Sequence, residues 1–407
     1  MAVDVARNDP GAQAAPAEVT AGVSVVIPTH AGRLPFLVRL LGSLQVAAGR
    51  AAEPVEVIVV DDSPGEAAVA AACATRGARY FCGPRRGGAK RNVGVHASRH
   101  DIVLFTDSDC VAHESLITAH LGALRAAGPE VAGVVGFTRF VGAGGWIWRL
   151  AERSGRYNSC FDWPLRYREV LWGATANLSV RRSAFLAVGG FDEGTWTVVG
   201  GEDGGLCTRI VDDGYRLLTG PAAVVLHGRD HLTTLRGLLR SMVRYGAADA
   251  YLCERFPART RVVLTPPVFI GGAAALAGLV RVVSGRGFLG RALAGGLAVL
   301  AARDYQAQRE RSARVRRERA RCGIGDGFDE DIAEAAKGAV PSLAGTSGHV
   351  SPATSPAGPA DVALDLACVV FDWAFDAGAA VAAVRHRRPD LLIRRFNYMD
   401  SHDFVER

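Results

Sequence analysis

The sequence lacks the cysteine spacing of zinc-binding and disulfide-stapled proteins. Its eight cysteines are scattered, no two of them form a Cys-x-x-Cys pair, and no histidine cluster accompanies them. This absence argues against a structural zinc site and a disulfide framework, and it fits a reducing compartment. The net charge of +6 is modest, so we expect no nucleic-acid partner, although the charge suits an anionic substrate or a membrane surface.

The amino-terminal segment lacks the apolar core that a secretory signal peptide carries. Residues 1–21 are rich in alanine and proline, so we expect a flexible arm there. The chain also has no internal repeat, which leaves ordinary globular domains as the expectation for its 407 residues.

Short apolar runs alternate with helical patterns over the first quarter of the chain. The runs read as buried strands, at 24–28, 55–60, 78–81 and 102–105, and the patterns between them read as helices, at 34–44, 66–76 and 87–98. Short connections between such elements indicate βαβ units. We therefore predict an α/β fold, with a mostly parallel sheet covered by helices on both faces.

The alternation loosens after residue 110. We expect a helix at 116–126, an antiparallel or edge strand at 131–140 and a mobile loop region at 142–167, which is rich in Trp, Arg and Gly. Beyond it we expect strands at 172–180 and 222–227, and helices at 183–188 and 202–213. Residues 22–256 then make up one domain.

The composition shifts near residue 262. Residues 262–280 carry no charge and reach the length of a bilayer span, a second apolar run covers 288–302, and eight arginines follow in 303–321. This order fits the cytoplasmic face of a membrane, but it also fits soluble helices followed by a solvated arginine helix. We expect an apolar, polybasic helical region at 257–321, a disordered linker at 322–360, and a last helix and tail at 361–407.

Two pairs of acidic residues follow predicted strands. Asp107 and Asp109 come after the run 102–105, and a spacing of two residues lets both carboxylates point to the same side. Converging carboxylates need a cation, and hard oxygen ligands suit Mg²⁺ or Mn²⁺. Asp61 and Asp62 end the run 55–60, where they can bind a nucleotide base or ribose, or simply cap the next helix.

Three further segments carry polar groups that could bind a ligand or take part in a reaction. Residues 85–92 surround two glycines with four cations at a helix start, which suits a phosphate or forms a solvated basic turn. Glu202 and Asp203 open a helix after two glycines, either as a general base with its neighbour or as a plain N-cap. His227 ends a short strand and can complete a metal shell, or be structural.

Taken in order, these motifs resemble family 2 glycosyltransferases of the GT-A fold. The matching segments cover residues 22–260 and are Val25-Val26-Ile27-Pro28-Thr29, Val59-Val60-Asp61-Asp62-Ser63, Ala89-Lys90-Arg91-Asn92-Val93-Gly94, Phe105-Thr106-Asp107-Ser108-Asp109, Gly189-Gly190-Phe191-Asp192-Glu193 and Gly201-Glu202-Asp203. The resemblance implies an inverting, metal-dependent transfer of one sugar from a nucleotide-sugar donor, with a UDP-sugar favoured, to an acceptor hydroxyl.

The resemblance also implies roles for individual residues. Asp203 is the expected general base, with Glu202 beside it in the acceptor site. Mn²⁺ or Mg²⁺ is expected on Asp109, Asp107 and His227. The expected donor-binding residues are Pro28, Thr29, Asp61, Asp62, Arg91, Asp107, Ser108, Trp172 and Gly173, and Ala174 and Asn177 are expected to face the donor sugar or acceptor.

The chain departs from the processive members of that family. Their Gln-x-x-Arg-Trp pattern is absent, and Arg244-Tyr245-Gly246 lies in its place, which favours transfer of a single sugar over polymer synthesis. Cell-surface glycan, glycolipid or secondary-metabolite synthesis at the cytoplasmic face of a membrane is the expected setting. Two alternatives stay open, a sugar-nucleotide nucleotidyltransferase and a non-catalytic glycan-binding protein of the same fold. Pro28-Thr29-His30 supplies no glycine-rich phosphate loop for the former.

Overall fold

A computed structural model describes residues 19–63, 67–142, 145–154, 157, 160–194, 200–229, 232–263, 265, 288–321 and 359–398. The predictions of a flexible arm at 1–21, an apolar run at 262–280 and a linker at 322–360 fall mainly outside these residues.

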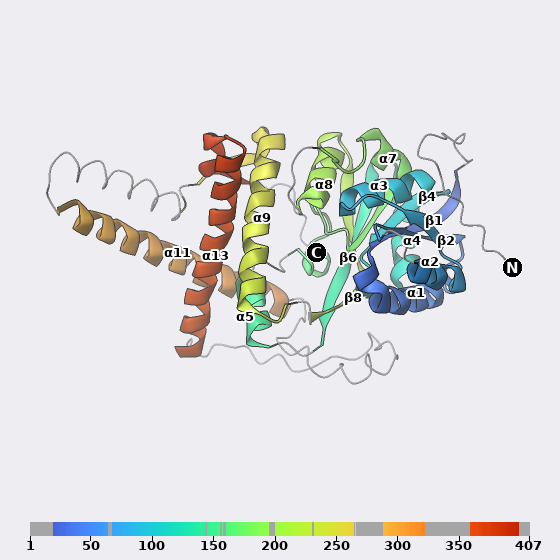
Figure 1. The fold of residues 1–407 in the computed structure, drawn as a ribbon, viewed down its shortest axis with the longest axis horizontal. Coiled ribbons are helices and arrows are strands. Elements are labelled where there is room, and N and C mark those ends of the chain that lie inside the picture. Colours follow the sequence, from blue (N-terminus) through green and yellow to red (C-terminus); the bar gives the residue numbers. More distant parts are fainter. Residues whose placement is uncertain are drawn as a thin grey trace.

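The described residues form an eight-stranded sheet with the order β3-β2-β1-β4-β7-β6-β8-β5 (Figure 1). Its first four strands are mutually parallel, namely β1 (Thr20–Thr29), β2 (Val55–Asp61), β3 (Arg79–Cys82) and β4 (His100–Thr106). The second half is mixed. It contains β5 (Cys110–Ala112), β6 (Val131–Val141), β7 (Asn177–Arg181) and β8 (Arg216–Gly228), of which β6 and β8 are parallel. The predicted α/β fold with a mostly parallel sheet is confirmed.

Helices cover both faces of the sheet, because successive strand residues point to opposite faces. Val25 and Ile27 pack on one face under α1 (Leu34–Ala48), α2 (Ala67–Thr75) and α4 (Leu116–Ala126). Val26 packs on the other, under α3 (Gly87–Ala97), α7 (Arg182–Ala187) and α8 (Glu202–Asp212). Figure 1 shows the two groups of helices on either side of the sheet. This double burial explains the continuous apolar runs in the strands.

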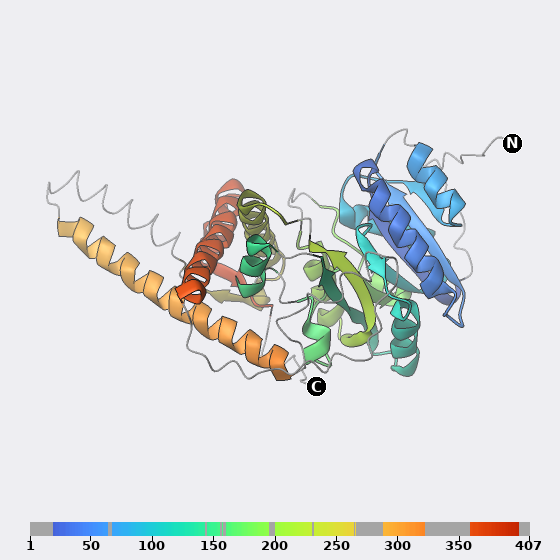
Figure 2. The same ribbon diagram turned by 90° about the horizontal axis from the view of Figure 1, so that it is seen from below.

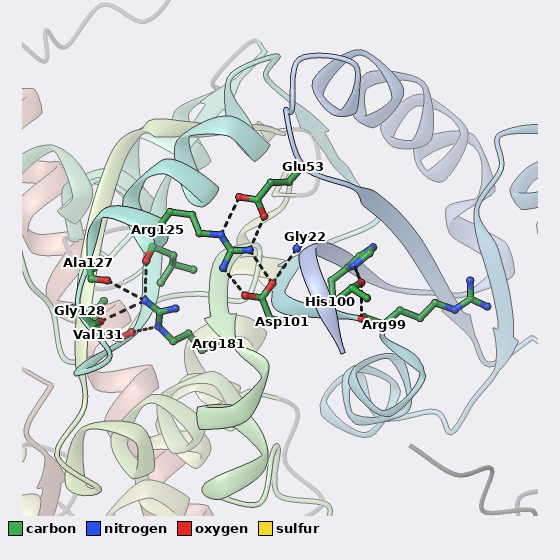
Figure 3. Close-up of polar contacts among 12 residues, drawn as sticks. Gly22, Glu53, Arg99, His100, Asp101, Arg125, Ala127, Gly128, Val131 and Arg181 are labelled. Atoms are coloured by element: carbon green, nitrogen blue, oxygen red, sulfur yellow. Dashed lines mark hydrogen bonds and ion pairs between the residues drawn. The ribbon is translucent and has the colours of Figure 1, made fainter. Parts of the chain in front are cut away.

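An ion-pair network lies at the end of the sheet where β1 and β4 begin (Figure 3). Arg125 on α4 donates to Glu53 at 2.6 and 2.9 Å and to Asp101 on β4 at 2.9 Å, and Asp101 accepts the Gly22 N–H on β1 at 3.0 Å. Nearby, Arg181 donates to carbonyls at the end of α4 and the start of β6. Burial acts to raise the pKa of Asp101, but Arg125 lowers it, so the network is charged at neutral pH. The opposite edge carries the candidate site.

One sequence-based expectation for the middle of the chain is wrong, and another is confirmed in one of its two alternatives. The expected loop region 142–167 contains α5 (Trp146–Ser154) and the short α6 (Trp163–Arg166). The arginines and glycines around α5 obscure an apolar face of Ile147, Leu150 and Ala151, which is buried against later helices. The strand expected at 131–140, antiparallel or at an edge, is β6, which is antiparallel to β7 and lies inside the sheet between β7 and β8.

A helical layer packs beside the sheet domain. α9 (Leu235–Arg255) and α13 (Pro359–Arg385) run side by side in the same direction (Figure 1). Two glycines allow this approach, because a Cβ on Gly246 would lie 1.7 Å from the Phe375 carbonyl oxygen and one on Gly378 would lie 2.1 Å from that of Val243. α11 (Phe288–Arg321) crosses α13, and its carboxyl-terminal end reaches toward the sheet domain (Figure 2), where Glu318 contacts Arg166 on α6.

The carboxyl-terminal part of the described chain returns to α9. After α13, the short helix η4 (Pro389–Leu392) leads into β10 (Arg394–Phe396), which pairs with β9 (Thr260–Val262) beyond the short helix η3 (Pro257–Arg259).

Among the described residues, one segment is long and apolar enough to cross a membrane, Val362–Arg385 of α13. Its mean hydropathy is 1.6, and 56% of its apolar window is buried inside the protein. Core helices of soluble proteins meet the same criterion, so this segment is weak evidence for a membrane span.

Candidate active site

The candidate site lies at the carboxyl ends of the parallel strands. β1 is flanked by β2 on one side and by β4 on the other, so the strand order reverses between β1 and β4. Ligands of open α/β sheets bind in the crevice at such a switch point. Thr29 ends β1, Asp61 ends β2, and Asp107 follows β4, so the predicted residues of the first domain half gather at this edge.

Strand pairing brings His227 to Asp109. β5 begins directly after Asp109 and pairs with β8, which places Cys110 opposite His227. The Nε2 atom of His227 lies 3.5 Å from Oδ2 of Asp109. The Nδ1 atom lies 2.9 Å from the Gly228 carbonyl oxygen, so Nδ1 carries the proton and Nε2 is the nitrogen that faces Asp109.

Asp109 and His227 fit a divalent cation. A ligating imidazole commonly donates its other N–H to a backbone carbonyl, as His227 does to Gly228. The ligand atoms of Asp109, Cys110 and His227 all lie within 4.8 Å of one another. Burial keeps the pKa of the Cys110 thiol well above its usual range, and a neutral thiol is a poor ligand for Mg²⁺ or Mn²⁺. The carboxylate and the imidazole are therefore the fitting pair.

A cation that the sequence analysis missed, Arg33, contacts the Asp109 carboxylate. Burial acts to raise the pKa of Asp109, but His227 and Arg33 together lower it, so Asp109 is ionised at neutral pH. Arg33 ends the short helix η1 (Ala31–Arg33) directly after β1. A basic residue just past a strand end, at the same edge as the acids, was the available signal.

Asp107 does not join the Asp109–His227 pair. Its carboxylate accepts a hydrogen bond from Arg91 at 2.6 Å, and the same guanidinium lies 3.8 Å from Glu202. Arg91 is buried on α3 and stacks over the Phe191 ring at 5.7 Å. It therefore ties the Asp-x-Asp turn to the start of α8, two segments about ninety residues apart.

The residues predicted at the base and ribose are held by the protein itself. Asp61 accepts hydrogen bonds from the backbone and hydroxyl of Ser63, at 3.2 and 2.9 Å. Asp62 pairs with Lys90 at 2.9 Å, and Lys90 also donates to the Thr29 carbonyl at 2.5 Å. Lys90 is one of the four cations of residues 85–92, the segment expected to suit a phosphate or form a basic turn, and here it contacts an acid. These bonds fix the loops after β1 and β2 at the switch point.

Three residues predicted to bind the nucleotide-sugar donor are largely buried. Pro28 pairs with Val60 within the β1–β2 ladder, and Ser108 is buried in the turn between β4 and β5. The Thr29 hydroxyl is buried and makes no hydrogen bond to the described residues.

Asp203 lies in the first turn of α8. Gly200 and Gly201 before it adopt φ angles of +112° and +86°, which favour glycine. The Thr175 N–H donates to the Asp203 carboxylate at 3.4 Å. Burial, with a smaller contribution from the Glu202 charge, raises the pKa of Asp203 to about 6. A carboxylate with this pKa is suited to accept a proton near neutral pH.

Trp172 and Gly173 lie in the loop between α6 and β7. A Cβ on Gly173 would meet the Val135 side chain at 2.5 Å, so this close approach requires glycine. Trp172 is half-buried and stacks edge-on against Trp163, with ring centroids 5.5 Å apart.

Asn177 was expected to face the donor or acceptor, and the structure shows otherwise. It is 1% exposed, and its amide donates at 2.9 Å to the carbonyls of Phe137 and Ala223. Its Oδ1 atom lies 2.8 Å from His120 Nε2. Asn177 therefore joins strands β6, β7 and β8 inside the sheet.

Comparison with known proteins finds similarity over the first part of the chain. Residues 24–189 match the family model described as glycosyl transferase family 2. Two curated proteins called pre-mycofactocin glycosyltransferase, from Mycobacterium tuberculosis strains CDC 1551 / Oshkosh and ATCC 25618 / H37Rv, are each 33% identical over 196 residues. The match covers 46% of this chain, and the chain spans 38% of the length of these relatives.

Two solved structures are similar to the chain at 18% identity. A mannosyltransferase, PcManGT from Pyrobaculum calidifontis in complex with GDP-Man and Mn²⁺, aligns with a TM-score of 0.45 over 74% of this chain and 87% of that one. Mannosyl-3-phosphoglycerate synthase from Rubrobacter xylanophilus aligns with a TM-score of 0.42 over 58% and 75%.

Proposed function

We propose that this chain, whose residues 24–189 form a family 2 glycosyltransferase domain, moves one sugar from a nucleotide-sugar donor to an acceptor hydroxyl with inversion at the anomeric carbon. The observation that carries the proposal is a pair of acids with opposite pKa shifts at one edge of the sheet. The pKa of Asp109 is lowered and that of Asp203 is raised to about 6. With such a pair, Asp109 stays charged while Asp203 can accept a proton.

On the acceptor side, Asp203 takes the proton from the attacking hydroxyl. The hydroxyl oxygen forms the new bond to the anomeric carbon from the face opposite the leaving group, and this in-line attack inverts the centre. The bond between that carbon and the diphosphate oxygen breaks, and its electron pair leaves with the nucleoside diphosphate. Burial keeps the Asp203 pKa raised, with a smaller contribution from the Glu202 charge, and the Arg91 guanidinium lies 3.8 Å from Glu202.

On the donor side, Asp109 and His227 would hold a divalent cation. The cation supplies Lewis-acid stabilisation of charge on the diphosphate. Arg33 and Arg91 add two guanidinium groups at the same edge, beside Asp109 and Asp107. Positive groups fixed where negative charge develops lower the barrier to departure of the leaving group. The preference for UDP stays a prediction, because the contacts of Asp61 and Asp62 in the structure are to Ser63 and Lys90.

The test is nucleotide release by the full chain from UDP-, GDP- and dTDP-sugars, with and without Mn²⁺. Asp203→Asn should lower kcat by roughly 10²- to 10⁴-fold, the usual contribution of a positioned base. Asp213→Asn, the same change at the exposed end of α8, should leave kcat unchanged. Full activity of Asp203→Asn would refute the base assignment, and turnover without metal would refute the role of Asp109.

The two alternatives predict different products. Release of pyrophosphate in place of nucleoside diphosphate would identify a nucleotidyltransferase. Binding of a glycan without nucleotide release from any donor would identify a non-catalytic protein.

We also propose that the chain lies on the cytoplasmic face of a membrane through α11 and α13. Val362, Leu366 and Val370, spaced four residues apart on α13, are 37 to 55% exposed. α11 crosses the same helix and is joined to it by the ion pair of Arg311 and Asp372 at 2.7 Å (Figure 2). Exposed arginines along α11 include Arg309. An apolar stripe beside a basic helix suits an anionic lipid surface.

Vesicle binding tests this placement. Removing Arg309 and Arg316 together, as Arg309→Gln/Arg316→Gln, should weaken binding to phosphatidylglycerol-containing vesicles by roughly tenfold or more, since each surface arginine contributes ~1 kcal/mol. The control, Arg50→Gln/Arg99→Gln, removes the same charge from the sheet domain and should bind as the wild type does. Equal binding by both variants would contradict the proposal.

A further inference from the structure

The last described residues return from the helical layer to the sheet domain. β10 pairs with β9, and just beyond it the Asn397 N–H donates to the Arg259 carbonyl at 2.9 Å. The next residue, Tyr398, lies against the Phe396 ring on one side, with centroids 5.0 Å apart. A segment about 140 residues after α9 in the sequence therefore lies against the residues that directly follow α9.

Buried charges fix this segment. Arg395 donates to Asp376 on α13 at 2.9 Å, and both side chains are less than a tenth exposed. The Phe396 N–H donates to the carboxylate of Asp249 on α9, which is 1% exposed. Loss of one partner of a buried pair is costly, so the position of Tyr398 is determined by the fold.

Tyr398 meets Trp172 of the sheet domain. The two ring centroids lie 5.6 Å apart at an angle of 51°, and both residues are half-buried. Trp172 belongs to the core cluster of the sheet domain, and Tyr398 to that of α9, α13 and β10. The pair joins two hydrophobic cores and keeps part of each residue accessible.

The pair lies beside the proposed base. From the loop after Trp172, the Gly173 carbonyl accepts from Cys207 on α8 at 3.9 Å, and the Thr175 N–H donates to Asp203. Burial raises the pKa of the Tyr398 hydroxyl well above its usual range, and the charges of Asp249 and Asp203 add to this effect. Tyr398 is therefore a neutral hydroxyl within electrostatic reach of Asp203.

We propose that Trp172 and Tyr398 form a platform for the acceptor, and that the acceptor hydroxyl is carried by a ring with an apolar face. Aromatic side chains bind flat apolar faces well, and the platform adjoins the carboxylate that must reach the attacking hydroxyl. A pyranose and an aryl group share this chemistry. The inference rests on the proposed glycosyl transfer, and it makes Tyr398 a specificity-determining residue at the far end of the chain.

The test compares three hydroxyl compounds with the full chain and an active donor. Methyl α-glucopyranoside and 2-phenylethanol carry the two kinds of ring, and glycerol carries none. Tyr398→Ala should lower kcat/KM for a ring acceptor by roughly 2- to 12-fold, the range for an aromatic contact, through KM. Tyr398→Phe should keep the wild-type value, and Tyr305→Ala on α11 serves as the matched control. Glycerol transfer and donor hydrolysis by water should not change.

The outcomes distinguish failure of the acceptor platform from failure of the proposed glycosyl transfer. Selective loss with one ring identifies that ring as the acceptor chemistry. An equal loss with glycerol would show that Tyr398 is only structural, and no loss with either ring would show that it does not contact the acceptor. Donor hydrolysis without transfer to either ring by the wild type would overturn this inference alone. A wild type that releases nucleotide from no donor would overturn the proposed function and the platform with it.

Discussion

The pH dependence of turnover gives a direct test of Asp203 as the base. Its raised pKa of about 6 means that about 91% of the chains carry the ionised carboxylate at pH 7 and about 9% at pH 5. Because only the ionised form accepts a proton, kcat/KM should fall about tenfold between pH 7 and pH 5. An aspartate with the ordinary pKa of ~3.9 would still be about 93% ionised at pH 5 and would give almost no change.

The assay is nucleotide release at low donor concentration from pH 4.5 to 8. Glu202→Gln should move the midpoint to lower pH, because the Glu202 charge helps to raise the Asp203 pKa and glutamine keeps an oxygen that can accept from Gly200. Burial is the larger cause, so the midpoint should stay above that of an ordinary aspartate.

Metal loss at low pH must be separated from titration of the base. Protons compete with a metal for its ligands, so a midpoint caused by metal loss moves to lower pH as Mn²⁺ is increased. A midpoint set by Asp203 stays in place. A profile that is flat from pH 5 to 8, or one whose midpoint follows the Mn²⁺ concentration, would refute the assignment.

Three further substitutions test other parts of the structure. Gly246→Ala should lower stability by at least ~3 kcal/mol in urea unfolding, since its Cβ would lie 1.7 Å from the Phe375 carbonyl oxygen, whereas Gly122→Ala, which meets nothing within 4 Å on α4, should be neutral or stabilising. Asn177→Ala should cost about 3 kcal/mol of stability through its lost buried hydrogen bonds, while a folded sample keeps its KM, and a raised KM at unchanged stability would contradict its structural role. His227→Ala should raise the Mn²⁺ concentration for half-maximal turnover by at least roughly tenfold, and an unchanged value would exclude His227 as a ligand.

The parallel half of the fold could be read from the sequence because its signals are local. β1, β2 and β4 are apolar runs that end in a polar residue, and α1 between β1 and β2 has its own apolar stripe. The region around α5 gave no such signal. Its apolar face is buried against α9 and α13, which come far later in the chain, so only the tertiary structure shows which of its residues are covered.

The residues of the candidate site were predictable where a short local sequence motif contains them. Asp109 and Asp203 follow recognisable motifs, but the approach of His227 to Asp109 depends on the antiparallel pairing of β5 and β8. Arg33 was missed, and Lys90 was noted only as one of the four cations of residues 85–92, because both residues act through contacts with acids on other loops. Asn177 was wrongly predicted to contact a ligand. Its amide nitrogen instead donates to two strand carbonyls inside the sheet.

The carboxyl-terminal region is joined to the sheet domain closely enough to affect any truncation experiment. A chain ending near Phe256 would lose α13, and the face of α9 around Gly246, now in backbone contact with Phe375, would be exposed to water. It would also lose Tyr398 and the residues that hold it. Reduced solubility or activity of such a fragment would therefore follow from the broken helix packing alone, with or without a membrane. Point substitutions on the exposed faces of α11 and α13 separate the two causes, because they leave the contact between α9 and α13 intact.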